Sequence, residues 1–125
     1  MGCAVTTIAQ LTLFIERHRN EHVFKGWHKN CVEHVQSVLT GLINKHAFVS
    51  TDSAGDVDGI GIVLPMAGEN EFYITQLLCI NAKARRSVIG QFMQTYPKAI
   101  VKQAERRGKT VTYKNSTKLL RLITK

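Results

Sequence analysis

Apolar and polar residues follow two different periods along this chain, and each period predicts its own kind of element. Apolar residues spaced three and four apart predict helices over Leu11–Phe24 and His28–Asn44. Short runs rich in β-branched and aromatic residues predict strands at Ala4–Ile8, His46–Ser50, Gly59–Leu64 and Phe72–Ile80. Polar turns separate the last three strands, so we expect them to form an antiparallel meander. In the second helix, the residues expected to face inward are Cys31, Val35, Val38, Leu39, Leu42 and Ile43.

The uncharged strand Phe72–Ile80 contains one break in its alternation. Phe72 and Ile74 share a face, but the adjacent Leu77 and Leu78 put the pattern out of phase. This break predicts a bulge or a splayed strand end near Gln76–Leu78. Such an irregularity would leave backbone N–H and C=O groups available to a ligand.

A helix is expected directly after this strand. Asn81 can cap its start, and Ala84, Val88 and Phe92 recur at helical spacing. Its first turn is crowded with Lys83, Arg85, Arg86 and Ser87. Cations are disfavoured at a helix N-terminus, so their presence indicates that an anion is meant to bind there.

The C-terminal third predicts further elements of the same single domain, which spans residues 1–125. The helical stretch is expected to continue to Gly108, with a kink or restart at Lys98 because Pro97 interrupts it. Lys109–Tyr113 follows as a strand and Lys118–Ile123 as a short helix. The predicted fold is α+β, with a mixed, largely antiparallel central sheet flanked by helices.

Charge is divided unevenly between the two parts of the chain. Residues 1–80 hold five Lys or Arg against eight Asp or Glu, whereas residues 81–125 hold twelve against one. So basic a segment favours a phosphate-rich partner, either a nucleotide cofactor or a nucleic acid. A solvated helix face is the alternative explanation.

Cysteine usage and hydropathy point to a soluble protein in a reducing cytoplasm. Cys3, Cys31 and Cys79 make no disulfide framework, and no apolar run is long enough to cross a bilayer. We therefore expect no membrane association. The N-terminal Met1–Thr6 also fits a short myristoylation pattern, for which an ordinary N-terminus is the simpler interpretation.

Two histidine patterns are compatible with metal binding but are better explained by helix packing. His18–His22 has the His-x-x-Glu-His order of inverted zinc proteases, yet no third ligand stands out. His28, Cys31 and His34 are three residues apart, so they drift around the helix axis. The sequence therefore predicts no metal.

The stretch from Leu78 to Met93 resembles the acetyl-coenzyme A segment of the GNAT acetyltransferases. In that family a strand leads into a turn of the form Arg/Gln-x-x-Gly-x-Gly/Ala and then a helix. Arg85 and Gly90 match the arginine and the last glycine, whereas Arg86 and Val88 stand where glycine is common. Asn115 matches an asparagine after the family's next strand. The chain ends before the family's last two strands, which implies a C-terminally truncated member.

The resemblance implies an acetyl-coenzyme A-dependent N-acetyltransferase acting on an amine or protein acceptor. The residues implied to contact the cofactor are Leu78, Cys79, Ile80, Lys83, Arg85, Arg86, Ser87, Val88, Ile89, Gly90 and Asn115. Tyr113 and Tyr73 are candidate general acids and Glu71 a candidate base. The sequence leaves open whether the protein is an active enzyme.

Two alternatives to catalysis remain at the sequence level. The basic C-terminal residues would let a non-catalytic protein bind nucleic acid, and an interaction protein with a GNAT-like fold is the other. Compact proteins of this kind occur in bacteriophages, so host cytoplasm or a virion would be the setting. A homodimer is expected if a second chain supplies the missing strands.

Overall fold

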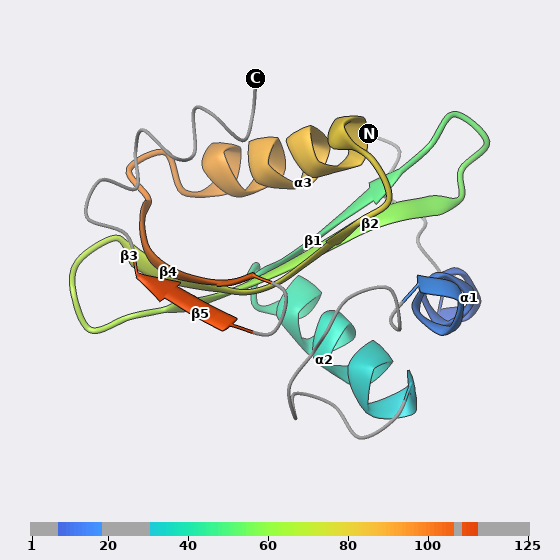
Figure 1. Cartoon of the computed structure of the whole chain (residues 1–125), viewed down its shortest axis with the longest axis horizontal. Coiled ribbons are helices and arrows are strands. Elements are labelled where there is room, and N and C mark those ends of the chain that lie inside the picture. The colour runs from blue at the N-terminus through green and yellow to red at the C-terminus, as the bar shows by residue number, and fades with distance from the viewer. Residues whose placement is uncertain (1–7, 19–30, 107–108, 113–125) are drawn as a thin grey trace.

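The computed structural model describes residues 8–18, 31–106 and 109–112 of the 125. Their helices and strands run, in chain order, α1 (Ile8–His18), α2 (Cys31–Ile43), β1 (Ala47–Thr51), β2 (Val57–Pro65), β3 (Glu71–Cys79), α3 (Ala82–Thr95), β4 (Ile100–Arg106) and β5 (Lys109–Thr112). One sheet forms the middle layer, with α3 on one face and α1 and α2 on the other (Figure 1). The α+β class and the helix-flanked sheet are as predicted.

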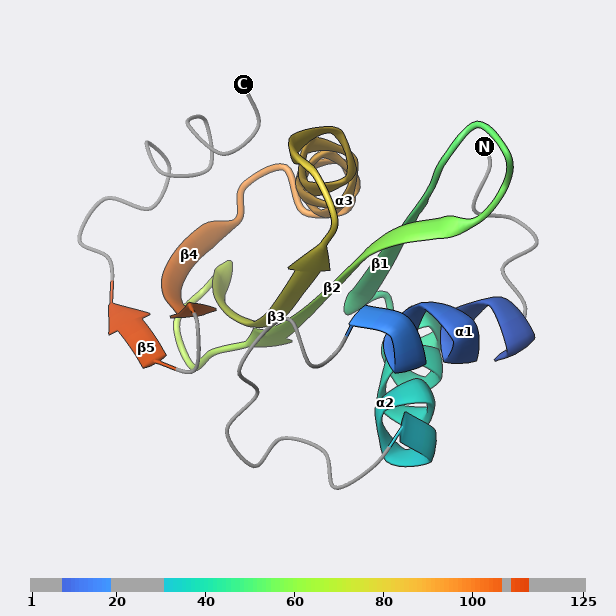
Figure 2. The same ribbon diagram turned by 45° about the vertical axis from the view of Figure 1, so that its right-hand side comes forward.

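The sheet has the strand order β1-β2-β3-β4-β5, and only one of its pairings is parallel. β1, β2 and β3 form the predicted antiparallel meander, and β4 and β5 form a second antiparallel hairpin. β3 and β4 run parallel because α3 carries the chain back across the sheet between them. Figure 2 shows α3 nearly end-on above one face of the sheet.

A separate apolar cluster fills each side of the sheet. The cluster under α1 and α2 includes Leu11, Ile15, Val38, Ile60 and Leu78, all fully buried. The cluster under α3 consists of Phe48, Val63, Phe72, Ile74, Val88, Ile89, Phe92, Val101 and Ala104. β2 and β3 contribute to both clusters and have a strand on each side, so they are buried on both faces.

The predicted break in β3 is confirmed, one residue earlier than the expected stretch. Gln76 lies opposite Ile62 in β2, but Ile74 lies opposite the next residue, Val63. Thr75 is therefore an extra residue, which makes a β-bulge. Before the bulge, Phe72 and Ile74 face α3; after it, Leu78 faces the other cluster.

The prediction of a helix continuing to Gly108 was wrong. α3 ends at Thr95, and residues from Ile100 to Arg106 form β4. Pro97 cannot donate the N–H that a continuing helix needs, so the chain leaves the helix there. The β-branched Val101 then becomes fully buried under α3 as part of a strand.

Two residues near the helix ends also differ from the prediction. Ile8, expected to end a strand, is the first residue of α1. Ile43, expected to face inward, is 81% exposed, because it lies about 100° around α2 from Leu42, which packs against the core. The predicted strand residues 4–7, the helix ends 19–24 and 28–30, Tyr113, Asn115 and the helix Lys118–Ile123 lie outside the described residues.

Candidate functional site

The start of α3 has the predicted cap and the predicted cluster of cations. Asn81 is the N-cap, and its side-chain oxygen accepts a 2.8 Å hydrogen bond from the Ala84 amide. Lys83, Arg85 and Arg86 are exposed around this first turn. An exposed positive surface therefore surrounds the positive end of the helix dipole.

These cations lie on different sides of α3. Lys83 lines a groove towards β1, together with Ser87, four residues further along the helix. Arg85 lies on the other side, close enough to Cys79 at the end of β3 for its charge to lower the pKa of that thiol. Arg85, and not Lys83, is thus the cation beside the end of β3.

Most amides of the predicted phosphate-binding turn belong to the helix itself. The Arg85 amide donates to the Asn81 carbonyl at 3.2 Å, and residues up to Gly90 lie inside α3, where each amide bonds to the preceding turn. Val88 and Ile89 are buried against the sheet. The helix start therefore offers an anion the amides of Ala82 and Lys83, the first two positions.

β3 and β4 part in the middle of β3, and this separation opens the edge of β3 next to α3. Their pairing runs from Glu71 opposite Ile100 to Ile74 opposite Ala104. Beyond that point β4 continues only with β5. Within the described part of the chain, no strand pairs with the β4-side edge of β3 from Thr75 to Cys79.

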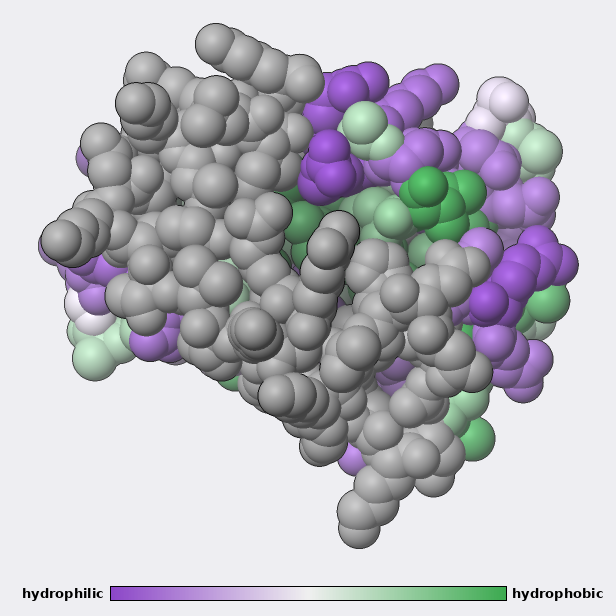
Figure 3. Space-filling view, viewed as in Figure 1, coloured by the Kyte–Doolittle hydropathy of each residue, from purple (hydrophilic) through white to green (hydrophobic). Residues whose placement is uncertain are grey.

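Hydrogen-bond alternation shows which groups this open edge presents. The Ile80 amide donates to the Asp58 carbonyl of β2 at 3.1 Å, so Ile80 directs its backbone groups towards β2. Alternate residues of an antiparallel strand point the other way, which directs the N–H and C=O of Leu77 and Cys79 to the open edge. Ile80 itself is 47% exposed. In the space-filling view, apolar surface lies beside the hydrophilic exposed side of α3 (Figure 3).

Cys79 is a protonated thiol and not a nucleophile at neutral pH. Burial raises its pKa to about 12, although a backbone hydrogen bond from Ile60 and the charge of Arg85 oppose this rise. The buried Asp58 adds to it. Cys79 therefore contributes its backbone to the open edge, and its side chain packs under α3.

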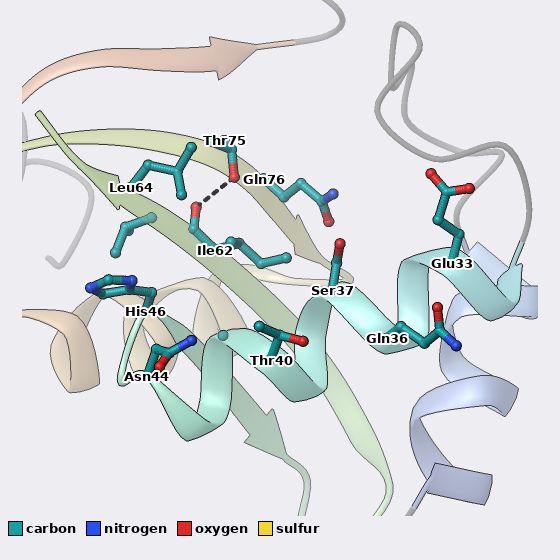
Figure 4. Close-up of a pocket in the computed structure, with 12 residues that line it drawn as sticks. Glu33, Gln36, Ser37, Thr40, Asn44, His46, Ile62, Leu64, Thr75 and Gln76 are labelled. Carbon is teal, nitrogen blue, oxygen red and sulfur yellow. Dashed lines mark hydrogen bonds between the residues drawn. The ribbon is translucent and has the colours of Figure 1, made fainter.

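A groove with both polar and apolar walls lies on the other face of the sheet, between α2 and strands β2 and β3. Its volume is about 430 Å³. One wall consists of Glu33, Gln36, Ser37, Thr40 and Asn44, which follow one side of α2, and Thr75 and Gln76 lie across from them (Figure 4). The groove therefore reaches the bulge of β3.

The groove and the open edge meet at Gln76, which the sequence prediction missed as a site residue. Gln76 is 2% exposed, and its Oε1 lies 2.6 Å from Nε2 of His34, which is fully buried in α2. Thr75 is held as well, because its hydroxyl donates to the Ile62 carbonyl at 3.2 Å. The only sequence signal was a polar pair, Thr75-Gln76, inside an apolar strand.

The two described candidates for acid–base chemistry differ in their distance from this junction. Glu71 begins β3, where the strands are still paired, and its carboxylate lies 3.8 Å from the Lys102 ammonium. It is four positions from Thr75, or about 13 Å along a strand. Tyr73 is two positions from Thr75 and belongs to one of the last two β3–β4 pairs. Tyr113 and Asn115 lie outside the described residues.

No family model, curated protein or solved structure matches this chain. Among the described residues, no three His, Cys, Asp or Glu side chains form a group suited to holding a metal ion. None of the helices described here has the length and apolar character needed to cross a membrane. The GNAT resemblance therefore depends on the residues quoted for it.

Proposed function

We propose that the protein is a GNAT-like N-acetyltransferase that takes acetyl-coenzyme A along the open edge of β3. The parting of parallel strands β3 and β4 after Ile74 is the observation that carries this proposal. It leaves a stretch of unpaired backbone that begins at a bulge and ends at the positive start of a helix. A ligand with an amide-containing arm and a diphosphate matches both features.

Along the edge, the amide groups of the pantetheine arm would pair with the backbone of Leu77 and Cys79. The diphosphate would lie at the amides of Ala82 and Lys83, with Arg85 beside it. Six positions separate Thr75 from Asn81, a span of about 20 Å along an extended chain. The thioester would then lie near the bulge, where the edge begins.

The groove under α2 would hold the acceptor amine. Among the described residues that line it, Glu33 is the acidic one and the other polar side chains are neutral or imidazole, so a small cation with hydrogen-bonding groups suits it. The ammonium group first loses a proton to water, and its nitrogen then attacks the thioester carbon. The C–S bond breaks with its electron pair on sulfur, and the second nitrogen proton leaves to water as the amide forms. Tyr73, near the parting of the strands, is the proposed acid for that thiolate. Glu71 is ion-paired with Lys102 and lies about 13 Å along the strand from Thr75, so we do not propose it as the base.

Thermal unfolding with and without acetyl-coenzyme A tests the proposal. Millimolar cofactor should raise the melting temperature, because a ligand at a hundred times its dissociation constant adds about 2.7 kcal/mol to stability. Arg85→Glu should abolish the rise, and Lys98→Glu, which reverses an equally exposed charge after α3, should keep it. Leu77→Pro should also abolish it, since proline removes the outward amide but not the pairing to β2.

A melting temperature that does not change when acetyl-coenzyme A is added would contradict the proposal. Nucleic-acid binding by the basic C-terminal residues is the alternative in that case. Filter binding to DNA and RNA over a salt series separates the two, because phosphate contacts give a steep loss of affinity with salt.

A further inference from the structure

β1 forms the opposite edge of the sheet from the β4–β5 hairpin. It follows the loop after α2 and pairs with β2 from Ala47 to Thr51. In the described ranges, no strand lies on its outer side. An edge strand of this kind presents unpaired backbone groups to any chain that can lie alongside it.

The direction of these groups follows from two hydrogen bonds. The His46 carbonyl accepts from the Val63 amide at 2.8 Å, so His46 and every second residue after it point their backbone towards β2. Ala47 and Val49 therefore point outwards. The outward carbonyl of Val49 accepts a 2.9 Å hydrogen bond from Nε2 of Gln91 in α3.

A polar groove of about 650 Å³ runs between this edge and α3. Its walls carry hydroxyl and amide side chains, including Ser50, Thr51, Ser53, Ser87, Gln91 and Gln94. Such groups match the donors and acceptors of an extended peptide backbone. The groove is therefore suited to a chain lying parallel to the edge, and less to an apolar helix.

Two charged side chains line the groove at its Thr51 end, Asp52 on the β1 side and Lys83 on α3. Asp52 is committed to its own turn, because its Oδ1 accepts hydrogen bonds from the amides of Ala54 at 2.9 Å and Asp56 at 3.0 Å. Lys83 is exposed on the opposite wall and, among the ion pairs of the described residues, takes part in none. An occupant with a carboxylate at this end would complement it.

Gln91 acts as a replaceable partner for the edge strand. Besides its bond to the Val49 carbonyl, its Nε2 lies 3.4 Å from the Ser87 hydroxyl, one turn away on the same helix. The amide can therefore keep a partner when a peptide N–H takes over the carbonyl. Without a peptide, Gln91 covers a backbone group that would otherwise be exposed at the edge.

We propose that the groove between β1 and α3 binds an extended segment of a partner protein, which adds to β1 as a further strand and places an acidic side chain next to Lys83. The proposed acetyl transfer uses the open edge of β3 instead, although the Lys83 amide at the start of α3 belongs to that site as well. Peptide binding needs no cofactor, so it is tested without one.

The test uses the full chain and two fluorescent peptides of alternating threonine and valine, one ending in glutamates and the other in lysines. Fluorescence anisotropy should show about tenfold tighter binding of the glutamate peptide. Lys83→Glu should reverse this preference, and the control Lys98→Glu should retain it. Hydrogen exchange should show protection of the Ala47 and Val49 amides when the glutamate peptide is bound.

Two further results decide the proposal. Val49→Pro removes an outward amide that β2 does not use, so it should abolish binding while the protein still unfolds cooperatively. If that variant does not fold, the Lys83→Glu comparison and the exchange data still decide. The proposal would be overturned if neither peptide binds. It would also be overturned if Lys83→Glu leaves the preference between the two peptides unchanged and the Val49 amide stays unprotected.

Discussion

His34 and Gln76 form a buried contact that joins α2 to the bulge of β3. Nε2 of the imidazole lies 2.6 Å from Oε1 of the carboxamide, and both side chains are almost completely excluded from solvent. A buried polar group that loses its partner keeps its desolvation cost. The pair therefore fixes both the position of α2 and the orientation of Gln76 at the candidate site.

Replacing either member of this pair should destabilise the fold. We expect Gln76→Leu and His34→Leu each to lower the free energy of unfolding by about 1–3 kcal/mol, measured by urea denaturation. The double variant should lose less than the two losses combined, because the loss of the contact between His34 and Gln76 is counted in both single variants. Gln36→Leu, on the exposed side of α2, is the control and should change stability by less than about 0.5 kcal/mol. Strict additivity would show that the two side chains are not coupled.

Two glycines should respond in opposite ways to alanine. A Cβ at Gly61 would collide with Cγ1 of Val88, which packs α3 against the sheet, so Gly61→Ala should cost about 1–3 kcal/mol. A Cβ at Gly90 meets nothing within 4 Å, so Gly90→Ala should stabilise α3 by about 0.5–1 kcal/mol. Thermal or urea unfolding measures both changes. Because the Gly90 amide lies inside the helix, Gly90→Ala should also leave acetyl-coenzyme A binding intact; a loss of binding would place the diphosphate further along α3 than proposed.

The Cys79 thiol should make the fold sensitive to alkali. Its pKa is about 12 in the folded chain, against an ordinary value of 9.0, so the folded state holds the proton more tightly. The stability linked to this group is complete below pH 9 and is lost as the pH rises towards 12. Urea midpoints between pH 9 and 11 should therefore fall more steeply for the natural protein than for Cys79→Ala. Parallel slopes would indicate that the thiol is more exposed than its position under α3 implies.

Substitutions of the N-cap residue Asn81 separate an effect on stability from an effect on ligand binding. Asn81→Ala removes the acceptor of the Ala84 amide and should lower the free energy of unfolding by about 1 kcal/mol. Asn81→Asp restores an acceptor and should unfold like the natural protein. Its negative charge would, however, repel a diphosphate at the same helix end, so acetyl-coenzyme A should bind it more weakly. Equal cofactor affinity in Asn81→Asp would exclude the helix start as the diphosphate site.

Sequence periodicity predicted the centre of the fold because local and tertiary preferences agree there. The largely apolar composition of Gly59–Leu64 and Phe72–Ile80 matches strands that are buried on both faces. The Asn81 cap is a local hydrogen bond, so it could be inferred from neighbouring residues alone. The break at Leu77-Leu78 likewise indicated the bulge, though the register with β2 decided its position.

The errors occurred where distant contacts decide the structure. Residues after Pro97 contain enough helix formers to continue the pattern, but β3 offers a pairing partner that only the fold brings near. The contact between His34 and Gln76 joins residues 42 positions apart, so no local pattern could reveal it. The same applies to the groove under α2, whose two walls come from separate parts of the chain.

The parallel ladder between β3 and β4 consists of only four residue pairs. Among the described strands it is the one ladder that joins the β4–β5 hairpin to the three-stranded meander, so its rupture would free the hairpin from the sheet. The burial of Val101 and Ala104 contributes to the free energy of that rupture. Each pair that opens would lengthen the unpaired edge of β3 towards Phe72. Opening of this ladder would therefore change the length of backbone that β3 offers to a ligand.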